Sequence, residues 1–212
     1  MDGGKTRFLI IRHAKSEGNL EHKFQGRDDT PLSDFGRKQA QTLKDRLKNE
    51  QIDAVYFSPL VRARDTAGIA FSERGVPLRQ ESLLLERNFG PLDGMRLDEA
   101  RSFYPNADDF YSGRISEINL EGVETIESVK KRSFDAIERL YRVHNGQNIA
   151  IVSHLFWIKS LLGRVMDISF AEARNKRVPA ASLTIISASL VDNTLKFDVE
   201  LIGDESHLQN IC

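Results

Sequence analysis

The sequence predicts an α/β fold, a three-layer sandwich in which helices cover both faces of a mainly parallel central sheet. Short apolar segments typical of buried strands alternate along the chain with longer segments whose apolar residues recur at helical spacing. Strands separated by helices imply crossover connections, and a parallel sheet has to be covered on both faces. No repeat, low-complexity tract or linker divides the 212 residues, so we expect a single domain over residues 1–212.

In the first half of the chain, capping and turn residues mark the ends of the predicted elements. Ser33 is placed to cap a helix, and Pro59 is placed to open the next one. Pro77 weakens any central position in a sheet, so the short segment around it predicts an edge strand. The elements predicted here are strands over residues 8–11, 54–57 and 76–79, and helices over about residues 33–49 and 59–71.

In the second half, residues 88–122 stand apart because they contain several Gly, Asn, Asp and Pro residues. We expect an irregular insertion there, with a short helix near residues 97–103. Asp192 and Asn193 separate the last two strand-like segments and predict a hairpin. The elements predicted after the insertion are helices over residues 124–143 and 156–162, and strands over residues 148–152, 182–189 and 195–201.

The composition excludes several classes of partner. The chain has 40% hydrophobic and 29% charged residues and a formal net charge of −1, so no global basic field would recruit nucleic acid or an anionic membrane. Cys212 is the only cysteine, which excludes a disulfide within the chain and favours a cytoplasmic location. No apolar segment approaches the roughly 18 residues needed to span a bilayer.

Polar residues follow three of the predicted strands. Arg12 and His13 come directly after the first strand, Ser58 after the second, and Ser153 and His154 after a later one. Because ligands of open α/β sheets bind just outside the carboxyl ends of the strands, we expect one edge to gather these residues. A fixed cation beside a neutral imidazole suits the handling of a phosphate group. The sequence therefore predicts a phosphate site at this edge.

The order and spacing of these motifs resemble the histidine phosphatase superfamily, also called the phosphoglycerate mutase-like fold. The resemblance covers residues 7 to about 163, and it implies that the insertion over about residues 88–122 covers the active site. The matching residues are Arg12-His13 with Ser16 and Asn19, Phe24-Gln25-Gly26 with Asp29-Thr30-Pro31-Leu32 and Gly36, Ser58-Pro59-Leu60 with Arg62-Ala63 and Thr66-Ala67, Leu85-Glu86 with Gly90 and Asp93-Gly94, Glu124-Thr125 with Arg132, and Val152-Ser153-His154.

The resemblance implies roles for the central residues. His13 would be the nucleophile, because a neutral imidazole nitrogen can attack phosphorus and hold the phosphoryl group covalently. Neighbouring cations would disfavour protonation of His13 and keep it nucleophilic. Arg12 and Arg62 would clamp the phosphoryl group, whose negative charge spreads over three oxygens, and His154 would direct another donor at it.

Glu86 would be the general acid that protonates the leaving group and then activates water. From the residues alone, Glu81 and Glu99 compete for this role, and an ordinary exposed ion pair between Glu86 and Arg87 is the alternative reading. The surrounding family pattern selects Glu86.

Further residues are expected to complete the phosphate or substrate contacts. Asn19 can donate an amide N–H to a phosphate oxygen, with Gln25 and Ser16 beside it, although Ser16 could instead stabilise the loop as a turn former. Gly26 would let the backbone come close to the ligand. Leu155 stands where the family usually has glycine, so a bulky side chain is expected to line or narrow the pocket.

No pattern in the sequence indicates a metal or a cofactor. There is no paired His, Asp and Glu set, and no GxxxxGK[ST] loop for a nucleotide, so we expect chemistry without either. His22, His144 and His207 have no partner pattern and are expected to face solvent.

Three functions remain open from the sequence. The first is a metal-independent phosphatase that acts on a small phosphorylated metabolite. The second is a phosphoglycerate mutase primed by 2,3-bisphosphoglycerate, which the resemblance disfavours because residues 95–122 lack the arginine cluster of the family's mutases. The third is a non-catalytic protein that binds a phosphometabolite or a phosphoprotein. A short edge strand near Val76 could also support a homodimer.

Overall fold

The computed structural model describes residues 4–112, 114–209 and 211, so the expectation for Cys212 lies outside the described residues. The strands are β1 (Thr6–Arg12), β2 (Ala54–Phe57), β3 (Leu78–Gln80), β4 (Asn148–Ser153), β5 (Leu183–Val191) and β6 (Thr194–Asp204). The helices are α1 (Glu17–Leu20), α2 (Asp34–Leu47), α3 (Val61–Phe71), α4 (Leu97–Phe103), α5 (Ala107–Tyr111), α6 (Ile126–Val143), α7 (Leu155–Val165) and α8 (Phe170–Ala173).

The strands form one sheet in the order β3-β2-β4-β1-β5-β6. The first four of these are parallel, while β5 pairs antiparallel with both β1 and β6. Arg12 is the register partner of Ser153, so β1 and β4 end at the same edge of the sheet. The predicted α/β sandwich is confirmed, with an antiparallel hairpin added to the parallel part.

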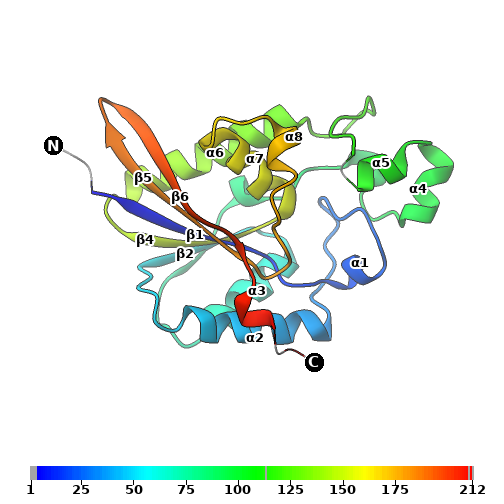
Figure 1. Ribbon diagram of the computed structural model, residues 1–212. Coiled ribbons are helices and arrows are strands. Elements are labelled where there is room, and N and C mark those ends of the chain that lie inside the picture. Colours follow the sequence, from blue (N-terminus) through cyan, green and yellow to red (C-terminus); the bar gives the residue numbers. More distant parts are fainter. Residues whose placement is uncertain (1–3, 113, 210, 212) are drawn as a thin grey trace.

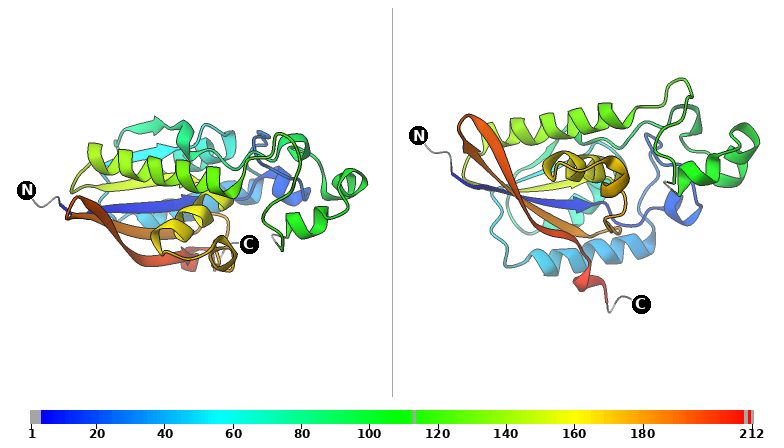
Figure 2. Two further views of the ribbon diagram at one scale, coloured as in Figure 1. Left: turned by 90° about the horizontal axis from the view of Figure 1, so that it is seen from above. Right: turned by 45° about the horizontal axis from the view of Figure 1, so that its top comes forward.

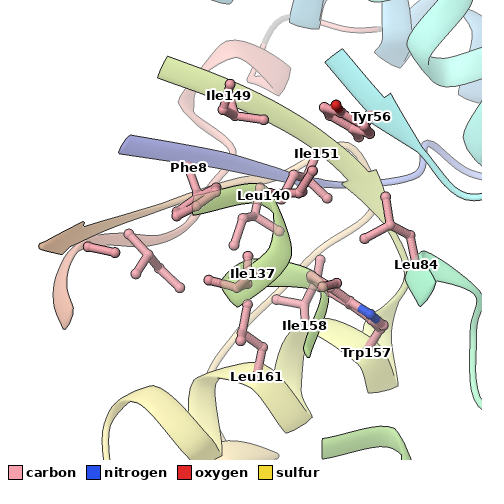
Figure 3. Packing of buried hydrophobic residues seen from close by; sticks show 14 of the residues in the cluster. Phe8, Tyr56, Leu84, Ile137, Leu140, Ile149, Ile151, Trp157, Ile158 and Leu161 are labelled. Carbon is pink, nitrogen blue, oxygen red and sulfur yellow. The ribbon is translucent and has the colours of Figure 1, made fainter. Parts of the chain in front are cut away.

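Alternate residues of β1 face the two outer layers, as the period of a strand requires. Phe8 and Ile10 pack with α6 and α7, as Figure 3 shows for Phe8 beside Ile137 and Leu140. Leu9 and Ile11 belong to the cluster on the other face, which α2 and α3 cover. Figure 1 shows the two helical layers on opposite sides of the sheet.

Local sequence signals explain several boundaries. The Ser33 hydroxyl accepts a hydrogen bond from the Gly36 N–H (3.1 Å) and caps α2 as predicted. Asp192 and Asn193 have φ values of +49° and +58°, which fit the tight turn of the predicted β5–β6 hairpin. Helix α3 begins at Val61, two residues later than the prediction from Pro59, and Leu60 is its N-cap.

The segment over residues 88–122 lies beyond the carboxyl ends of the parallel strands, where Figure 2 shows α4 and α5 projecting from the sandwich. It has its own apolar cluster, in which Phe24, Phe89 and Phe110 are buried and Phe156 of α7 packs at the margin. Helix α4 coincides with the predicted helix, whereas α5 was not predicted.

The expectation that three histidines face solvent is wrong for His144. Its ring is buried, with Nε2 2.9 Å from the Tyr56 hydroxyl and Nδ1 2.6 Å from Oε1 of Gln147. Tertiary contacts of this kind leave no pattern in the sequence. His22 is exposed, and His207 is half-buried against the Ala181 carbonyl. Within the ranges that the structure describes, no helix has the length and apolarity to cross a membrane.

Candidate active site

A cavity of about 220 Å³ opens at the carboxyl ends of β1 and β4. The predicted site residues that line it are Arg12, His13, Asn19, Gln25, Glu86 and Leu155. The other predicted residues, Ser16, Gly26, Arg62 and His154, are buried around it and do not form its lining. One edge of the sheet therefore brings together residues that lie up to 143 positions apart in the chain, from Arg12 to Leu155.

His13 is held as a neutral imidazole with one nitrogen free to react. Its ring is 4% exposed, and Nδ1 lies 2.7 Å from the Ala14 carbonyl oxygen. A carbonyl oxygen can only accept, so Nδ1 carries the hydrogen and Nε2 keeps its lone pair. Burial, and then the charges of Arg62 and Arg12, lower the pKa of His13 well below its ordinary value of 6.5. The imidazole is therefore uncharged at neutral pH.

Arg62 is fully buried and is anchored by backbone carbonyls. Its Nη1 donates to the Asp28 oxygen (2.7 Å), and its Nη2 donates to the oxygens of Gln25 (2.7 Å) and Gly26 (3.0 Å). Burial lowers the pKa of Arg62 to about 10, so the group stays cationic at neutral pH. These bonds use both terminal nitrogens of the guanidinium and fix its orientation.

Two donors at the site are buried without a hydrogen-bond partner among the described residues. They are Nε of Arg62 and Nε of Arg12, whose Nη1 donates to the Val178 oxygen at 2.8 Å. Leaving a charged donor unpaired is costly, so each Nε is a candidate donor to a bound anion. The pair therefore has the chemistry of an oxyanion clamp.

His154 lies beside His13, with ring centroids 5.1 Å apart. Its Nε2 is 2.7 Å from the Ser58 hydroxyl, while its buried Nδ1 has no partner in the part of the chain that the structure describes. Burial and the charge of Arg62 lower the pKa of His154 well below 6.5. If the Ser58 hydroxyl donates to Nε2, the hydrogen of the neutral ring is on Nδ1 and supplies another donor at the site.

Glu86 is buried at the N-terminus of α7. Its carboxylate accepts hydrogen bonds from the backbone N–H groups of Arg87 (2.8 Å), Phe156 (3.2 Å) and Trp157 (3.3 Å). The two competing residues do not line the cavity: Glu81 pairs with Arg139 (2.7 Å), and Glu99 caps α4 at the surface. Of the three candidates, only Glu86 is positioned to exchange a proton with a group in the cavity.

Asn19 presents its amide nitrogen to the cavity because its oxygen is already engaged. Asn19 Oδ1 accepts from the backbone N–H of Ser16 (3.0 Å) and lies 2.9 Å from the Ser16 hydroxyl. The Ser16 hydroxyl also lies 2.5 Å from Oε1 of Gln25, which accepts from Thr30 at 2.8 Å. Ser16 thus orients two amide side chains, which fits the turn-forming alternative rather than direct contact with a ligand.

The structure gives a further reason for glycine at position 26, while the expected approach of its backbone to a ligand stays a prediction. A Cβ at this position would lie 2.1 Å from Oδ1 of Asp93 and 2.5 Å from the Arg87 carbonyl oxygen. Glycine is required here because other parts of the protein pack against it. Its carbonyl oxygen contributes to the site only by holding Arg62.

Arg87 ties the insertion to the cavity, a role that no sequence pattern indicates. Its side chain is fully buried, and its guanidinium lies over the rings of Phe89, Phe110 and Phe156 at 5.1–5.9 Å from the centroids. It also donates to the carbonyl oxygens of Ser116 and Glu124, both at 2.6 Å. The exposed ion pair between Glu86 and Arg87 is therefore excluded.

The sequence reasoning also missed most of the aromatic part of the lining. Phe24, Phe89, Tyr111 and Phe156 come from four separate segments, and Lys23 adds a cation at the rim. Phe24 belongs to a matching family motif, but the motif assigns it no role, and an aromatic residue elsewhere predicts burial without indicating where it is buried. Within residues 4–112, 114–209 and 211, no group of three or more His, Cys, Asp or Glu residues could hold a metal ion.

Comparisons with known proteins place the chain in a family. The family model described as "Histidine phosphatase superfamily (branch 1)" matches residues 8–197. The chain is similar to phosphoglycerate mutase-like protein 4 of Arabidopsis thaliana, at 31% identity over 95% of this chain and 86% of the relative. It is 27% identical to phosphoserine phosphatase 1 of Hydrogenobacter thermophilus, over 85% and 86%. The structure of Bacillus stearothermophilus YhfR superposes with a TM-score of 0.87 at 28% identity, covering 96% of this chain and all of that one.

Proposed function

Since the chain belongs to the histidine phosphatase superfamily, we propose that it hydrolyses a small phosphate monoester through a phosphohistidine intermediate and without a metal ion. The observation that carries this proposal is the state of His13. Its neutral imidazole has the Nδ1–H fixed on a carbonyl and is close enough to two guanidinium groups for their charges to lower its pKa, and the buried Nε atoms of both have no protein partner among the described residues.

In the first step, Nε2 of His13 attacks phosphorus and the ester P–O bond breaks. Arg12, Arg62, His154 and Asn19 would donate to the phosphoryl oxygens, where negative charge is spread in the transition state. The protonated Glu86 carboxyl would give its proton to the leaving oxygen, so the alcohol departs uncharged. This step leaves the phosphoryl group on His13.

In the second step, the Glu86 carboxylate would take a proton from a water molecule as its oxygen attacks the phosphohistidine. The P–N bond then breaks, and His13 returns to its neutral form with inorganic phosphate as the product. The same donors hold the phosphoryl oxygens in both steps, so the protein does not have to rearrange between them.

The names of similar proteins support an ester of a small metabolite. One relative is named a phosphoserine phosphatase, and the catalytic cavity of about 220 Å³ suits a small substrate. Leu155 lies in the cavity wall, as expected from its bulk, and restricts the space next to His154.

Phosphoglycerate mutase is the second candidate because another relative is named mutase-like. A mutase would need cations in the insertion to grip the carboxylate and the second phosphate of its substrate. The arginines of this segment instead pair with neighbouring carboxylates on the surface: Arg96 with Asp98, Arg101 with Asp108, and Arg114 with Asp109. This pairing favours hydrolysis over mutase activity.

The test is phosphorus NMR of the protein with 3-phosphoglycerate, a trace of 2,3-bisphosphoglycerate and a strong chelator, with His13→Ala in parallel. A second sample contains p-nitrophenyl phosphate as a general monoester. We expect inorganic phosphate from at least one of these esters, and none with His13→Ala. An alkaline quench during turnover should trap phosphohistidine on the unsubstituted protein alone.

Other outcomes would replace the proposal. Formation of 2-phosphoglycerate without release of phosphate would identify a mutase. Activity that the chelator removes and an added metal restores would contradict metal independence. Binding of the esters without any phosphoenzyme would identify a non-catalytic phosphate-binding protein.

A further inference from the structure

A second cavity of about 300 Å³ adjoins the catalytic one. The two share Tyr111, Leu155 and Phe156 in their linings, so these three side chains form the boundary between them. We call this second cavity the distal lobe, lined by those three residues with Lys159, Phe170 and Arg174 among others. A substrate that extends past Leu155 and Phe156 would therefore enter a further space rather than bulk solvent.

Helix α7 places Lys159 in line with the catalytic site. Lys159 is four residues after Leu155 and three after Phe156, so all three lie on one face of the helix. It is five residues after His154, which puts its Cα about 7.5 Å further along the helix axis. Because the Cα–Cβ bonds of a helix tilt towards its N-terminus, the Lys159 side chain leaves the helix on the side nearer the catalytic cavity.

The distal lobe is cationic. None of the described residues that line it is acidic, whereas Lys159 and Arg174 are both half-buried in its wall. Arg114 also reaches the lobe, but its guanidinium pairs with Asp109. Lys159 Nζ donates to the Arg174 carbonyl oxygen at 2.6 Å, and this bond ties the lysine to the loop after α8 and leaves two of its three hydrogens for other acceptors.

The charge on Lys159 is coupled to the catalytic centre. Burial, followed by the charges of Arg12 and Arg174, lowers the pKa of Lys159 to about 8, and Glu86 acts in the opposite direction. Both Arg12 and Glu86 are therefore close enough to Lys159 for their charges to change its pKa. An anion bound in the distal lobe would relieve the repulsion between these cations.

Aromatic rings make the lobe suitable for an extended ligand. Phe156 and Phe170 lie with their rings nearly parallel, 17° apart in orientation and 6.0 Å apart between centroids. Both line the distal lobe, and Phe156 also lines the catalytic cavity, so they provide an apolar wall that begins at the boundary between the two. Small-molecule sites commonly combine such walls with a few fixed polar groups that set orientation.

We propose that the distal lobe binds a second anionic group, a carboxylate or phosphate at the far end of the substrate, and that Lys159 and Arg174 determine this specificity. The inference rests on the proposed function, because it assumes that the scissile phosphate binds beside His13. The substrate class is thus an elongated phosphate monoester with an anion at each end.

The test compares two ligands of equal shape, 4-carboxyphenyl phosphate and 4-carbamoylphenyl phosphate, which differ in the charge at the far end. Calorimetry on the His13→Ala variant gives the Kd of each ligand without turnover. We expect the carboxylate to bind about tenfold more tightly, since it gains a charge-assisted hydrogen bond. Adding Lys159→Gln should bring the ratio of the two Kd values close to unity, whereas Lys159→Arg should largely retain it.

Two further variants complete the design. Lys131→Gln removes an exposed lysine of α6 that lines neither cavity, and it should leave the ratio as it is. Arg174→Gln should reduce the ratio of the two Kd values independently. If circular dichroism shows that Lys159→Gln is unfolded, Arg174→Gln is the variant that tests the inference. Equal Kd values with Lys159 present, or a ratio that survives both Lys159→Gln and Arg174→Gln, would overturn the inference.

Failure of the proposed function would look different. The unsubstituted protein would then hydrolyse neither ligand, although the carboxylate could still bind more tightly in a way that depends on Lys159. In that outcome the distal lobe stands as an anion site and only the hydrolytic role is lost.

Discussion

The reactivity of the site depends on where single hydrogens lie. The Ala14 carbonyl fixes the hydrogen of His13 on Nδ1 and leaves the lone pair of Nε2 free, as the proposed nucleophile requires. On His154 the Ser58 hydroxyl lies 2.7 Å from Nε2, and if it donates there the hydrogen of the neutral ring is on Nδ1. Two neutral histidines thus take opposite parts, one as a lone-pair donor and one as a hydrogen donor, because their partners differ.

Ser58→Ala is therefore expected to impair catalysis without removing any group that contacts the substrate. Loss of the hydroxyl leaves Nε2 of His154 without its donor and allows the hydrogen to move from Nδ1. We expect kcat/KM for p-nitrophenyl phosphate to fall about tenfold, the effect of one well-placed hydrogen bond. Nitrogen NMR of His154 should show the change of tautomer directly.

Ser160→Ala is the matched control for this substitution. Ser160 is also buried, on α7, but its hydroxyl has no hydrogen-bond partner among the residues described. Its removal should change kcat/KM very little. An equal loss in both variants would mean that Ser58 acts only through packing.

At the residue scale, the sequence predicts the groups that stand at strand ends. Arg12, His13 and His154 lie at the ends of apolar strands. Because β1 and β4 are parallel neighbours, these ends meet at one edge of the sheet, as the sequence motifs predict. Arg87 could not be predicted, because its partners are aromatic rings and carbonyls up to 69 residues away. The need for glycine at position 26 likewise arises from Asp93, which the chain brings close only on folding.

At the scale of elements, helix α7 links several parts of the site. Its N-terminus follows His154, its first N–H groups hold Glu86, and its half-buried Lys159 lines the distal lobe. The apolar spacing predicts this helix, but its ends and its contacts depend on the sheet. Helix α5 was missed because its five residues, Ala107–Tyr111, are too few for a periodic pattern.

Replacing glycine with alanine is expected to have opposite effects on stability at two helix positions. Gly36 lies in the first turn of α2, where a Cβ would be 1.9 Å from the Lys15 carbonyl oxygen. That oxygen already accepts from the Ser33 N–H (3.0 Å), so the loop after His13 cannot move away freely. Gly36→Ala should lower the free energy of unfolding by about 2 kcal/mol, as overpacked sites do.

Gly68 is the counterpart in α3. It is exposed, and no atom lies within 4 Å of a Cβ built at this position. Gly68→Ala should raise the free energy of unfolding by about 0.5–1 kcal/mol, because alanine favours the helix. Urea unfolding of both variants measures the two effects. A gain in stability for both would show that helix propensity, rather than the fit of α2 against Lys15, controls these positions.

At the scale of the whole molecule, the site places several ionisable groups where water does not reach. His13, Arg62, Arg87 and His154 are all buried at one end of the sandwich, and burial lowers the pKa of each. The apolar layers on the two faces of the sheet supply the stability that offsets this cost. The burial that keeps the two histidines uncharged at neutral pH therefore also makes the folded state less stable in acid.

The stability of the protein should consequently fall with acid in a way that depends on the buried histidines. Below about pH 6.5 the unfolded chain binds protons on His13 and His154 that the folded protein does not, because their folded pKa values are lowered. The free energy of unfolding should then drop by about 1.4 kcal/mol per pH unit for each histidine, until the folded pKa is reached. Above about pH 6.5 both states are neutral at these positions, and the contribution is constant.

His154→Gln isolates one of these contributions. Urea unfolding at about pH 7 and about pH 5.5 should show a smaller loss of stability in this variant than in the unsubstituted protein, since one uncharged buried histidine no longer opposes protonation. His22→Gln removes an exposed histidine and should leave the loss unchanged. If His154→Gln and the unsubstituted protein lose the same free energy over this range, His154 takes up its proton in the folded state as readily as in the unfolded chain. Burial would then not lower the pKa of His154 from its ordinary value of about 6.5, and the argument that burial keeps this ring neutral beside His13 would have to be abandoned.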